Sequence, residues 1–387
     1  MMKQRISDIA DAILKKSNNE KLPYIEIGDI NVETKQYIGK DKPAVEGALK
    51  AKKDHVLISK VRPTRRAVTI ITKDCLVSNA FIVLQAQKSI IPKYLFYSIA
   101  YNKRFFLQLG KLERGTSYPS CRAKDILTYK ISVPIISEQK EIIKILDIAN
   151  NLRVKRKEQL AFLDDYLKSI FLDMFGDPME NEKAWKIVKI YDVIIDGPQN
   201  GLYKPSIFYG NGVPILRIDC FYNGMVTDIA KLKRVVVTDE ELRRFQIHED
   251  DIVINRVNSR SHLGKCALIP GLSEKTVFES NMMRLTVDKT KILPLFLSKF
   301  LTTPFVKKQI LNSAKDAVNQ SSINQNDVNN FELFLPPINL QYKFVSIVEQ
   351  VEQIKQKMCA SLDEMNNHFN SLIVVKLWVL NFGTLMT

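Results

Sequence analysis

The sequence is poor in the residues that cross-link a chain or bind a metal ion. Five cysteines are scattered over 387 residues, and the four histidines show no metal-ligand spacing. A disulfide framework needs paired cysteines, and a zinc site needs cysteines or histidines at short intervals. We therefore expect neither a cross-linked secreted domain nor a metal site.

Motifs that hold nucleotides or carry catalysis are also missing. The 14 glycines form neither the GxxxxGK[ST] loop of ATP sites nor a GxGxxG loop after an expected strand. The Asn-Pro-Pro-aromatic tetrad of amino-methyltransferases does not occur. Asp164-Asp165 and Asp250-Asp251 are better explained as solvated surface pairs than as a nuclease site. These absences predict a chain with no active site and no cofactor of its own.

Long apolar runs are absent as well. The stretch Leu372–Leu380 contains Lys376, and a membrane-spanning helix needs about 20 apolar residues. The first 16 residues carry Asp8 and Asp11 and lack the continuous apolar core of a signal peptide. We therefore expect a cytoplasmic protein with no membrane partner.

Positive charge is abundant and unevenly distributed. The formal net charge is +15, from 57 basic and 42 acidic residues. Residues 1–137 hold 25 basic and 12 acidic residues, whereas residues 176–339 hold 21 and 19. The intervening segment 138–175 and the final segment 340–387 are neutral. This pattern favours an acidic partner, nucleic acid first, on the globular parts of the chain.

The most informative feature is an internal duplication. When the chain is shifted by 202 positions, Ser78-Asn79 matches Ser280-Asn281, and Gln139 matches Gln341. With small gaps, Asp54–Ile58 also matches the segment that starts at Asp250. The chain is thus a tandem of two units of about 200 residues, because solenoid repeats recur every 20–50 residues.

Each unit ends in a long stretch without glycine or proline, residues 138–175 and 340–376. Apolar residues recur in alternating steps of three and four, which predicts one apolar stripe on a helix about 55 Å long. One extra residue near Arg156 and near Met358 predicts a stutter in the heptad pattern. We expect the two helices to form an antiparallel coiled coil. The expected seam residues are Ile145, Leu152, Leu160, Leu163, Leu167, Ile347, Val351, Ile354, Leu362 and Phe369.

The rest of each unit mixes short apolar runs, typical of strands, with shorter helices expected over residues 92–101 and 294–308. The predicted fold class is α+β, with two pseudo-repeated globular domains joined by two long antiparallel helices. The expected boundaries are residues 1–133, 134–175, 176–335, 336–380 and a divergent tail at 381–387.

Two polar segments recur in the copies and make candidate DNA contacts. One follows the matched strand, at residues 59–66 and 255–265, and the other lies at 114–120 and 315–322. Arginine, lysine, amide and hydroxyl groups are those that hold phosphates and bind base edges. The alternative is that both segments are ordinary polar surface turns. The candidate residues are Lys60, Arg62, Arg65, Arg66, Arg114, Tyr118, Arg256, Asn258, Arg260, His262, Lys265, Asn319 and Gln320.

Several local motifs, in this order and duplication, resemble the specificity subunit of type I restriction-modification enzymes. They are Ile25–Ile30, Leu216–Asp219, Val133-Pro134 followed by Glu138-Gln139 and Ile142, Phe171–Pro178 and Trp185. The chain departs from the family pattern in lacking a tryptophan near Arg5, in carrying Leu340 before Gln341, and in its C-terminal end.

The resemblance implies that each globular domain binds one half of a bipartite, asymmetric DNA site, and that the helices set the spacer. Two modification subunits that use S-adenosylmethionine to methylate adenine N6 would dock on the chain. Restriction subunits that use ATP and Mg²⁺ would join them, and this chain would be non-catalytic. The alternatives are a stand-alone DNA methyltransferase or nuclease, and a coiled-coil scaffold with a basic face for a membrane or an acidic protein.

Overall fold

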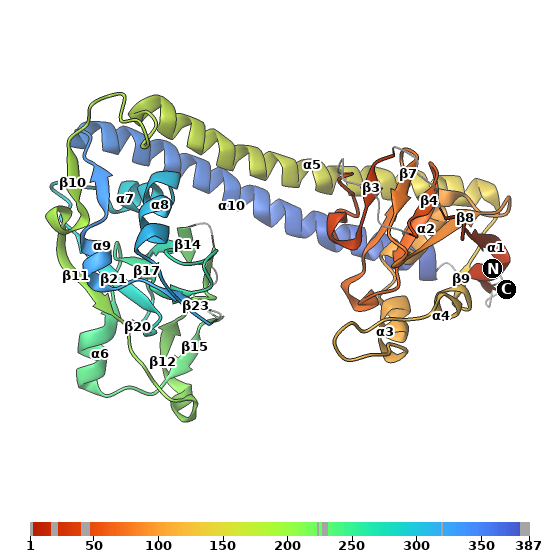
Figure 1. The fold of residues 1–387 in the computed structure, drawn as a ribbon, viewed down its shortest axis with the longest axis horizontal. Coiled ribbons are helices and arrows are strands. Elements are labelled where there is room, and N and C mark those ends of the chain that lie inside the picture. The colour runs from red at the N-terminus through yellow and green to blue at the C-terminus, as the bar shows by residue number, and fades with distance from the viewer. Residues whose placement is uncertain are drawn as a thin grey trace, which may run out of the picture. The chain divides into compact units, whose positions relative to one another are not determined.

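The computed structural model describes residues 3–16, 22–39, 47–222, 224–226, 231–318 and 320–379. The backbone divides into two compact units, which we describe separately. Unit 1 comprises Met1–Leu160 with Lys357–Thr387, and unit 2 comprises Ala161–Gln356. Two long helices each contribute a segment to both units (Figure 1). They are α5 (Ile136–Phe175) and α10 (Ile338–Val374).

Unit 1 has a four-stranded sheet in the order β2-β8-β5-β6, a three-stranded sheet in the order β3-β7-β4, and a small pair, β1 with β9. Its elements are β1 (Lys3–Arg5), α1 (Ile6–Ile9), β2 (Ala10–Ala12), β3 (Tyr24–Ile25), η1 (Ile27–Asp29), β4 (Leu49–Ala51), β5 (Val56–Ser59), η2 (Pro63–Arg65), β6 (Val68–Ile70), β7 (Cys75–Val77), β8 (Phe81–Ala86), α2 (Pro92–Ala100), α3 (Lys103–Lys111), α4 (Ala123–Leu127), β9 (Lys130–Ser132) and η6 (Val375–Val379).

Unit 2 is built from more strands, in sheets β11-β21-β17-β19-β14-β13, β15-β12-β20-β16, β18-β23-β22 and β10-β24. Its elements are β10 (Ile187–Lys189), η3 (Ile190–Val193), β11 (Ile194–Asn200), η4 (Ser206–Phe208), β12 (Tyr209–Leu216), β13 (Phe221–Tyr222), β14 (Gly224–Val226), β15 (Lys233–Val235), α6 (Asp239–Phe245), β16 (Gln246–Ile247), β17 (Ile252–Asn255), β18 (Val257–Asn258), β19 (Cys266–Leu268), β20 (Thr276–Phe278), β21 (Met282–Val287), α7 (Pro294–Phe300), α8 (Pro304–Ser313), β22 (Lys315–Ala317), β23 (Gln320–Ser322), α9 (Gln325–Asn329) and β24 (Glu332–Phe334).

The strand pairing of unit 1 recurs in unit 2. The antiparallel order β2-β8-β5-β6 corresponds to β11-β21-β17-β19, and β3 runs parallel to β7 as β12 runs parallel to β20. The pair β1-β9 corresponds to β10-β24. The predicted α+β fold with a duplicated unit is therefore confirmed. The predicted domain boundaries stay predictions, and the tail at 381–387 lies outside the described residues.

The helix predicted over residues 294–308 is in fact two helices, α7 and α8. Proline has no backbone N–H and fits the first turn of a helix, so Pro304 begins α8 instead of continuing α7. The same break in unit 1 separates α2 from α3, which the sequence analysis did not anticipate. Asn102 accepts a hydrogen bond from the Phe105 N–H and so caps the start of α3.

The two long helices pair in opposite directions within each unit. In unit 1, Ile142 and Leu146 of α5 share a hydrophobic cluster with Phe369 and Ile373 of α10. Further along α5, Arg153 donates a hydrogen bond to Asn366, which precedes Phe369. As the residue number rises on α5 it falls on α10, so the predicted antiparallel pairing is confirmed in unit 1.

Unit 2 shows the same direction of pairing. Lys355 of α10 donates to Asp164 of α5, whereas Phe344 packs against Phe171 and Phe175, with ring centroids 5.6 and 5.4 Å apart. Lower numbers on α10 again meet higher numbers on α5. The aromatic cluster anchors this end of the helix pair in the core of unit 2.

Two of the expected seam residues, Leu152 and Ile354, point to solvent and are 51% and 48% exposed. Arg153 and Lys355 occupy the inward positions instead, with long aliphatic stems that can line an apolar seam. Elsewhere Leu146 and Val348 are the fully buried neighbours of the half-buried Ile145 and Ile347. The remaining expected seam residues are buried or half-buried. These are Leu160, Leu163, Leu167, Val351, Leu362 and Phe369.

The predicted stutter is therefore wrong. Inward-facing or half-buried positions on α5 fall at residues 142, 146, 149, 153, 156 and 160, and on α10 at 344, 348, 351, 355, 358 and 362. These steps alternate four and three without an extra residue, which is an unbroken heptad pattern. A stutter was predicted because the apolar residues Leu152 and Ile354, and not their charged neighbours, were placed in the seam.

The charged seam residues make equivalent contacts in the two units. Arg153 Nε lies 2.7 Å from Asn366 Oδ1, and its guanidinium carbon is 4.2 Å from the centre of the Phe369 ring. Lys355 Nζ lies 2.8 Å from Asp164 Oδ1 and 3.3 Å from Glu352. The 202-residue shift relates Arg153 to Lys355, and their partners Asp164 and Asn366 to each other in the same way. The duplication therefore extends to the polar contacts of the helices.

A buried glutamine ties each long helix to its unit. Gln139 is fully buried; its Oε1 accepts from the Ile91 N–H at 2.8 Å, and its Nε2 donates to the carbonyls of Ser89 and Pro134. Gln341 likewise accepts a hydrogen bond from the Leu293 N–H and donates to two backbone carbonyls. Its carbonyl partners are those of Lys291 and Pro336. This tie explains why the same glutamine follows the proline in both copies.

Replacing Gln139 by alanine is expected to destabilise unit 1 by about 2–4 kcal/mol, because it leaves buried backbone groups without partners. Denaturant unfolding of the full chain measures the effect, and Gln341→Ala should give a similar loss in unit 2. The control is Glu138→Ala, an exposed neighbour. Equal stability of Gln139→Ala and the control would contradict the tie.

His55 immediately precedes β5, as Asp251 immediately precedes β17. The Lys52 N–H donates to His55 Nδ1 at 3.2 Å, as the His248 N–H donates to Asp251 Oδ2 at 2.8 Å. Burial, with the nearby Lys52 charge, holds the pKa of His55 below its usual value of 6.5. The folded state therefore prefers the neutral ring, whose Nδ1 can accept this bond.

The stability of unit 1 is consequently expected to fall as the pH drops below about 6.5, because the unfolded chain takes up the proton first. His55→Asn keeps an acceptor but does not titrate, so the fall between pH 7 and 5 should become shallower. Unfolding measured across this pH range tests this, with exposed His368→Asn as the matched control. An unchanged pH profile in His55→Asn would exclude His55 as the cause.

Candidate nucleic-acid interface

In unit 1 the two polar segments predicted from the sequence lie side by side and are joined by backbone hydrogen bonds. The chain leaving β5 is bonded to the later segment through Arg62 N–H to the Pro119 carbonyl at 2.7 Å, and through Cys121 N–H to the Lys60 carbonyl at 2.9 Å. A bridge between Val61 and Ser120 completes the contact. Lys60, Arg62, Arg114 and Tyr118 therefore belong to one surface.

The arginines around η2 have different environments. Arg62 and Arg66 flank η2 with φ of 45° and 59°, in the left-handed region that is uncommon for arginine. The Arg62 guanidinium donates to the Ser117 carbonyl at 3.2 Å and lies over the ring of Tyr118, which is itself 74% exposed. Arg62 thus holds the two segments together, whereas Arg65 is exposed, with no ion pair or side-chain hydrogen bond within the described residues.

Other candidates in unit 1 are partly engaged. Arg114 Nη1 lies 3.3 Å from Asp125 Oδ2, so this exposed arginine has an acidic partner. Lys60 is half-buried, and its burial lowers the pKa of the ammonium group. Arg66 is exposed, but its guanidinium lies 5.9 Å from the centre of the Phe106 ring in α3.

Unit 2 brings the corresponding segments together in the same way. Strand β18 pairs with β23, so that Val257 opposes Ser322 as Val61 opposes Ser120. The Ile323 N–H donates to the Arg256 carbonyl at 2.9 Å, matching the bond from Cys121 to Lys60. The juxtaposition of the two segments is thus a property of the duplicated fold.

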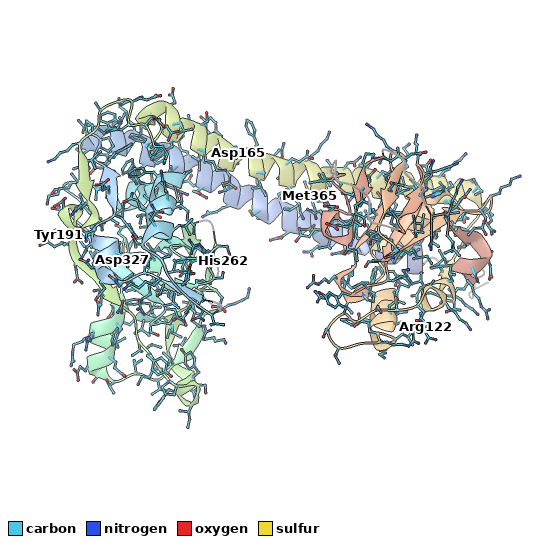
Figure 2. The ribbon with its side chains drawn as sticks, in the orientation of Figure 1. Arg122, Asp165, Tyr191, His262, Asp327 and Met365 are labelled. Carbon is cyan, nitrogen blue, oxygen red and sulfur yellow. The ribbon has the colours of Figure 1, made fainter. Side chains whose placement is uncertain are left out.

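The candidates in unit 2 are tied down more than the sequence indicated. Arg256 Nη1 donates to the Ser280 carbonyl at 3.2 Å, and Arg260 forms an ion pair with Asp316. His262 lies on the following turn (Figure 2), where its Nδ1 contacts two serine hydroxyls, 3.0 Å from Ser259 and 2.9 Å from Ser261.

Three further candidates lie beside this surface. Asn258 accepts from the Ser259 N–H, and Lys265 lies 5.1 Å from the centre of the Phe221 ring, where burial lowers the pKa of the ammonium group. Gln320 is exposed in β23. Asn319 lies outside the described residues.

Arg256 and Arg260 follow Asp250 and Asp251 closely in the sequence but do not pair with them. Asp250 pairs with Lys289 at 2.6 Å. Asp251 accepts from the His248 N–H and from the Thr286 hydroxyl. Both acids serve the start of β17, at the opposite end of the strand from the two arginines, so closeness in sequence did not become closeness in space.

A family model described as the type I restriction modification DNA specificity domain matches residues 2–161 and 182–363. The chain belongs to this family. The predicted resemblance is therefore confirmed, and the two matches correspond to the two copies of the duplicated unit.

The matches to curated relatives cover only part of each relative's length. The chain is 30% identical over 189 residues to the putative type I restriction enzyme MjaX specificity subunit of Methanocaldococcus jannaschii, covering 48% of this chain and 44% of that one. It is 24% identical over 285 residues to the EcoKI specificity subunit of Escherichia coli, covering 69% and 61%. The chain thus matches less than two thirds of the length of these relatives.

Solved structures support the fold. The S subunit of a type I restriction-modification system from M. genitalium superposes with a TM-score of 0.58 at 14% identity, covering 97% of this chain and 96% of that one. A chain from a type I R-M system solved for complex assembly gives a TM-score of 0.52 at 17% identity, covering 97% of each. At these identities the similarity shows the fold alone.

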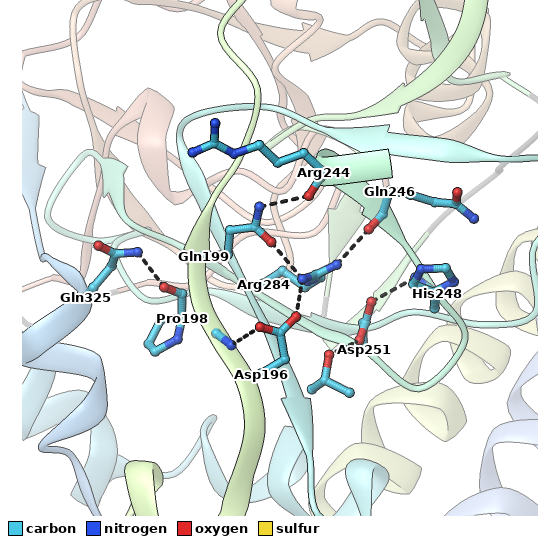
Figure 3. Close-up of polar contacts among 11 residues, drawn as sticks. Asp196, Pro198, Gln199, Arg244, Gln246, His248, Asp251, Arg284 and Gln325 are labelled. Carbon is cyan, nitrogen blue, oxygen red and sulfur yellow. Dashed lines mark hydrogen bonds and ion pairs between the residues drawn. The ribbon is translucent and has the colours of Figure 1, made fainter. Parts of the chain in front are cut away.

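A polar cluster in this specificity-family chain was missed by the sequence analysis. Arg284 is 7% exposed and donates to Gln199 Oε1 at 2.7 Å and to the Gln246 carbonyl at 2.8 Å, and it pairs with Asp196 (Figure 3). Gln199 also donates to the Arg244 carbonyl. The cluster holds the irregular part of β11 against β21, and an arginine inside a largely apolar strand was its signal in the sequence.

The charges of α3 were also missed. Lys103, Arg104 and Lys111 lie on its exposed face, beside η2. Their spacing along a helix would have indicated one basic face, but no helix was predicted at this position. Within the described residues, no group of histidine, cysteine or acidic side chains could hold a metal ion. None of the helices described is long and apolar enough to cross a membrane.

Proposed function

We propose that this chain is the DNA-recognition subunit of a type I restriction-modification complex. Each unit would bind one half of a bipartite, asymmetric site, and α5 and α10 would set the spacer between the halves. The observation that carries the proposal is the surface formed by two polar segments, joined by equivalent backbone bonds in both units. Membership of the specificity family favours this function over a stand-alone enzyme or a basic scaffold.

The partners and cofactors follow from the same proposal. Two modification subunits would bring S-adenosylmethionine and methylate adenine N6, and restriction subunits would bring ATP and Mg²⁺ for cleavage. This chain would carry no cofactor and no catalytic group, and the complex would act in the cytoplasm, where its DNA lies. The basic surplus of the sequence suits double-stranded DNA as the direct partner.

Methylome sequencing of cells that carry this chain with the modification subunit of its own system tests the proposal. We expect methylated adenines within one bipartite motif that has a fixed spacer. The purified chain alone should transfer no methyl group. Methyl transfer by the pure chain, or a motif without two separated halves, would overturn the proposal.

Arg256 is the best candidate in unit 2 for contact with a base edge, because it is tethered at Ser280 and has no acidic partner in the described part of the chain. Arg256→Ala is expected to weaken binding to the specific site by about 1–3 kcal/mol, with little effect on random duplex. Fluorescence anisotropy on both duplexes measures the difference.

The matched control is Arg234→Ala, which removes a surface arginine paired with Glu274 at 2.7 Å. It should leave both affinities nearly unchanged. An equal loss on specific and random DNA in Arg256→Ala would assign Arg256 to the phosphates instead of the bases.

A further inference from the structure

Helix α3 of unit 1 has one buried and one basic face. Phe105, Phe106 and Leu109 are buried in the core of unit 1. The opposite face exposes Lys103, Arg104, Leu107, Gln108 and Lys111. The helix therefore holds three cations in fixed positions on a rigid element.

α3 lies directly against η2. A Cβ atom added at Gly110 would come within 2.9 Å of the Thr64 methyl group, so the glycine permits this close approach. Arg66, at the end of η2, packs over Phe106 of α3. Arg65, Arg66, Lys103, Arg104 and Lys111 thus lie on two segments that pack against each other, and we call this set of cations the α3 face.

The α3 face has no acidic residue of its own. Neither η2 nor α3 contains aspartate or glutamate. Within the described residues, no ion pair involves any of its five cations, in contrast to nearby Arg114, which pairs with Asp125. These charges are therefore available to an external anion.

The counterpart in unit 2 differs. α8 packs against the turn at residues 259–264, as α3 packs against η2, but its Lys307 donates to the Leu263 carbonyl at 2.6 Å and is half-buried. Arg260, on that turn, is paired with Asp316. Only Lys308 of α8 is an exposed cation with no ion pair in the described part of the chain. The α3 face therefore carries more unpaired positive charge than the equivalent place in unit 2.

We propose that the α3 face binds the phosphate backbone of DNA beside the half-site of unit 1, and that it supplies more of the sequence-independent affinity than its counterpart in unit 2. Unit 2 then depends more on base contacts. The proposal rests on the proposed function and adds to it an unequal division of labour between the units. Its physical basis is counterion release, to which each phosphate neutralised by a cation contributes.

The test removes the three helical charges in the full chain assembled with its modification subunit, as Lys103→Gln, Arg104→Gln and Lys111→Gln together. Binding to a site-containing and a random duplex is measured over a range of salt concentrations. We expect the slope of log K against log salt to become shallower by about two to three, with similar losses on both duplexes. The ratio of the two affinities should stay the same.

Two controls keep the result interpretable. The triple variant Lys73→Gln, Lys88→Gln and Lys275→Gln removes the same charge from exposed positions outside the α3 face and should change the slope by less than one. The variant Lys103→Arg with Lys111→Arg keeps the charge and should keep the wild-type slope. Circular dichroism checks that every variant is folded.

An unchanged slope in the helical triple variant would overturn the proposal. Loss of assembly with the modification subunit at an unchanged slope would also overturn it, and would assign the α3 face to an acidic protein surface. Failure of the proposed function would give a different result. The complex without substitutions would then bind a duplex with a bipartite site no more tightly than a random duplex.

Discussion

Replacing residues 1–133 with the equivalent unit of another specificity-family protein is expected to change one half of the methylated site completely. The other half and the spacer should stay as they were. The strand pairings and the hydrophobic cluster described for the first globular part consist of unit 1 residues, so we expect its recognition surface to form independently. Methylome sequencing of cells that carry the hybrid measures the outcome.

The reciprocal exchange of residues 176–335 is the matched control and should change only the other half-site. If either exchange alters both halves together, the units do not recognise DNA independently. A hybrid that fails to fold is identified beforehand by its unfolding transition, and an exchange boundary moved to the start of α5 then replaces the first design.

Adding seven residues to both long helices is expected to lengthen the unmethylated spacer by about three base pairs. Seven residues add about 10.5 Å to a helix, and successive base pairs are about 3.4 Å apart. Because the seam is an unbroken heptad pattern, one added heptad keeps every inward position inward. Suitable places are between Lys157 and Glu158 on α5, and between Leu362 and Asp363 on α10.

The control for this design lengthens α5 alone. It moves Arg153 and Lys355 relative to their partners on the opposite helix by unequal amounts, so the paired seam cannot form along its whole length. We expect strongly reduced modification from this control. An insertion of four residues would instead rotate the following residues by about 40° off the seam. An unchanged spacer in the doubly lengthened chain would show that the helices do not set it.

Much of the fold could be predicted because the duplication supplies two independent copies of each pattern. Gln139 and Gln341 follow a proline at the same distance, and the structure gives them the same three backbone partners. It was harder to predict which residues of the long helices face each other in the seam. Apolar Leu152 and Ile354 were placed in the seam, but the phase of a helix is set by all its contacts, and the stems of Arg153 and Lys355 line it equally well.

The candidate surface was predicted less completely. The recurrence of two polar segments indicated a shared role, and hydrogen bonding joins them in both units. Ion pairs were not predictable, because Arg260 finds Asp316 far away in sequence instead of the nearby Asp250. α3 escaped notice because its helix is short and its start depends on the Asn102 side chain.

The glutamine tie bears on how such proteins acquire new specificities. All three partners of Gln139 are backbone atoms within residues 89–134, and those of Gln341 lie within residues 291–336. A recombination event that joins a foreign globular part to an existing long helix therefore keeps this tie wherever the main chain follows the same path. Side chains of the helix such as Ile142 and Leu146 still have to fit the foreign core. We therefore expect genes of this kind to exchange one globular part at a time and still encode a folded product, in which α5 and α10 are retained.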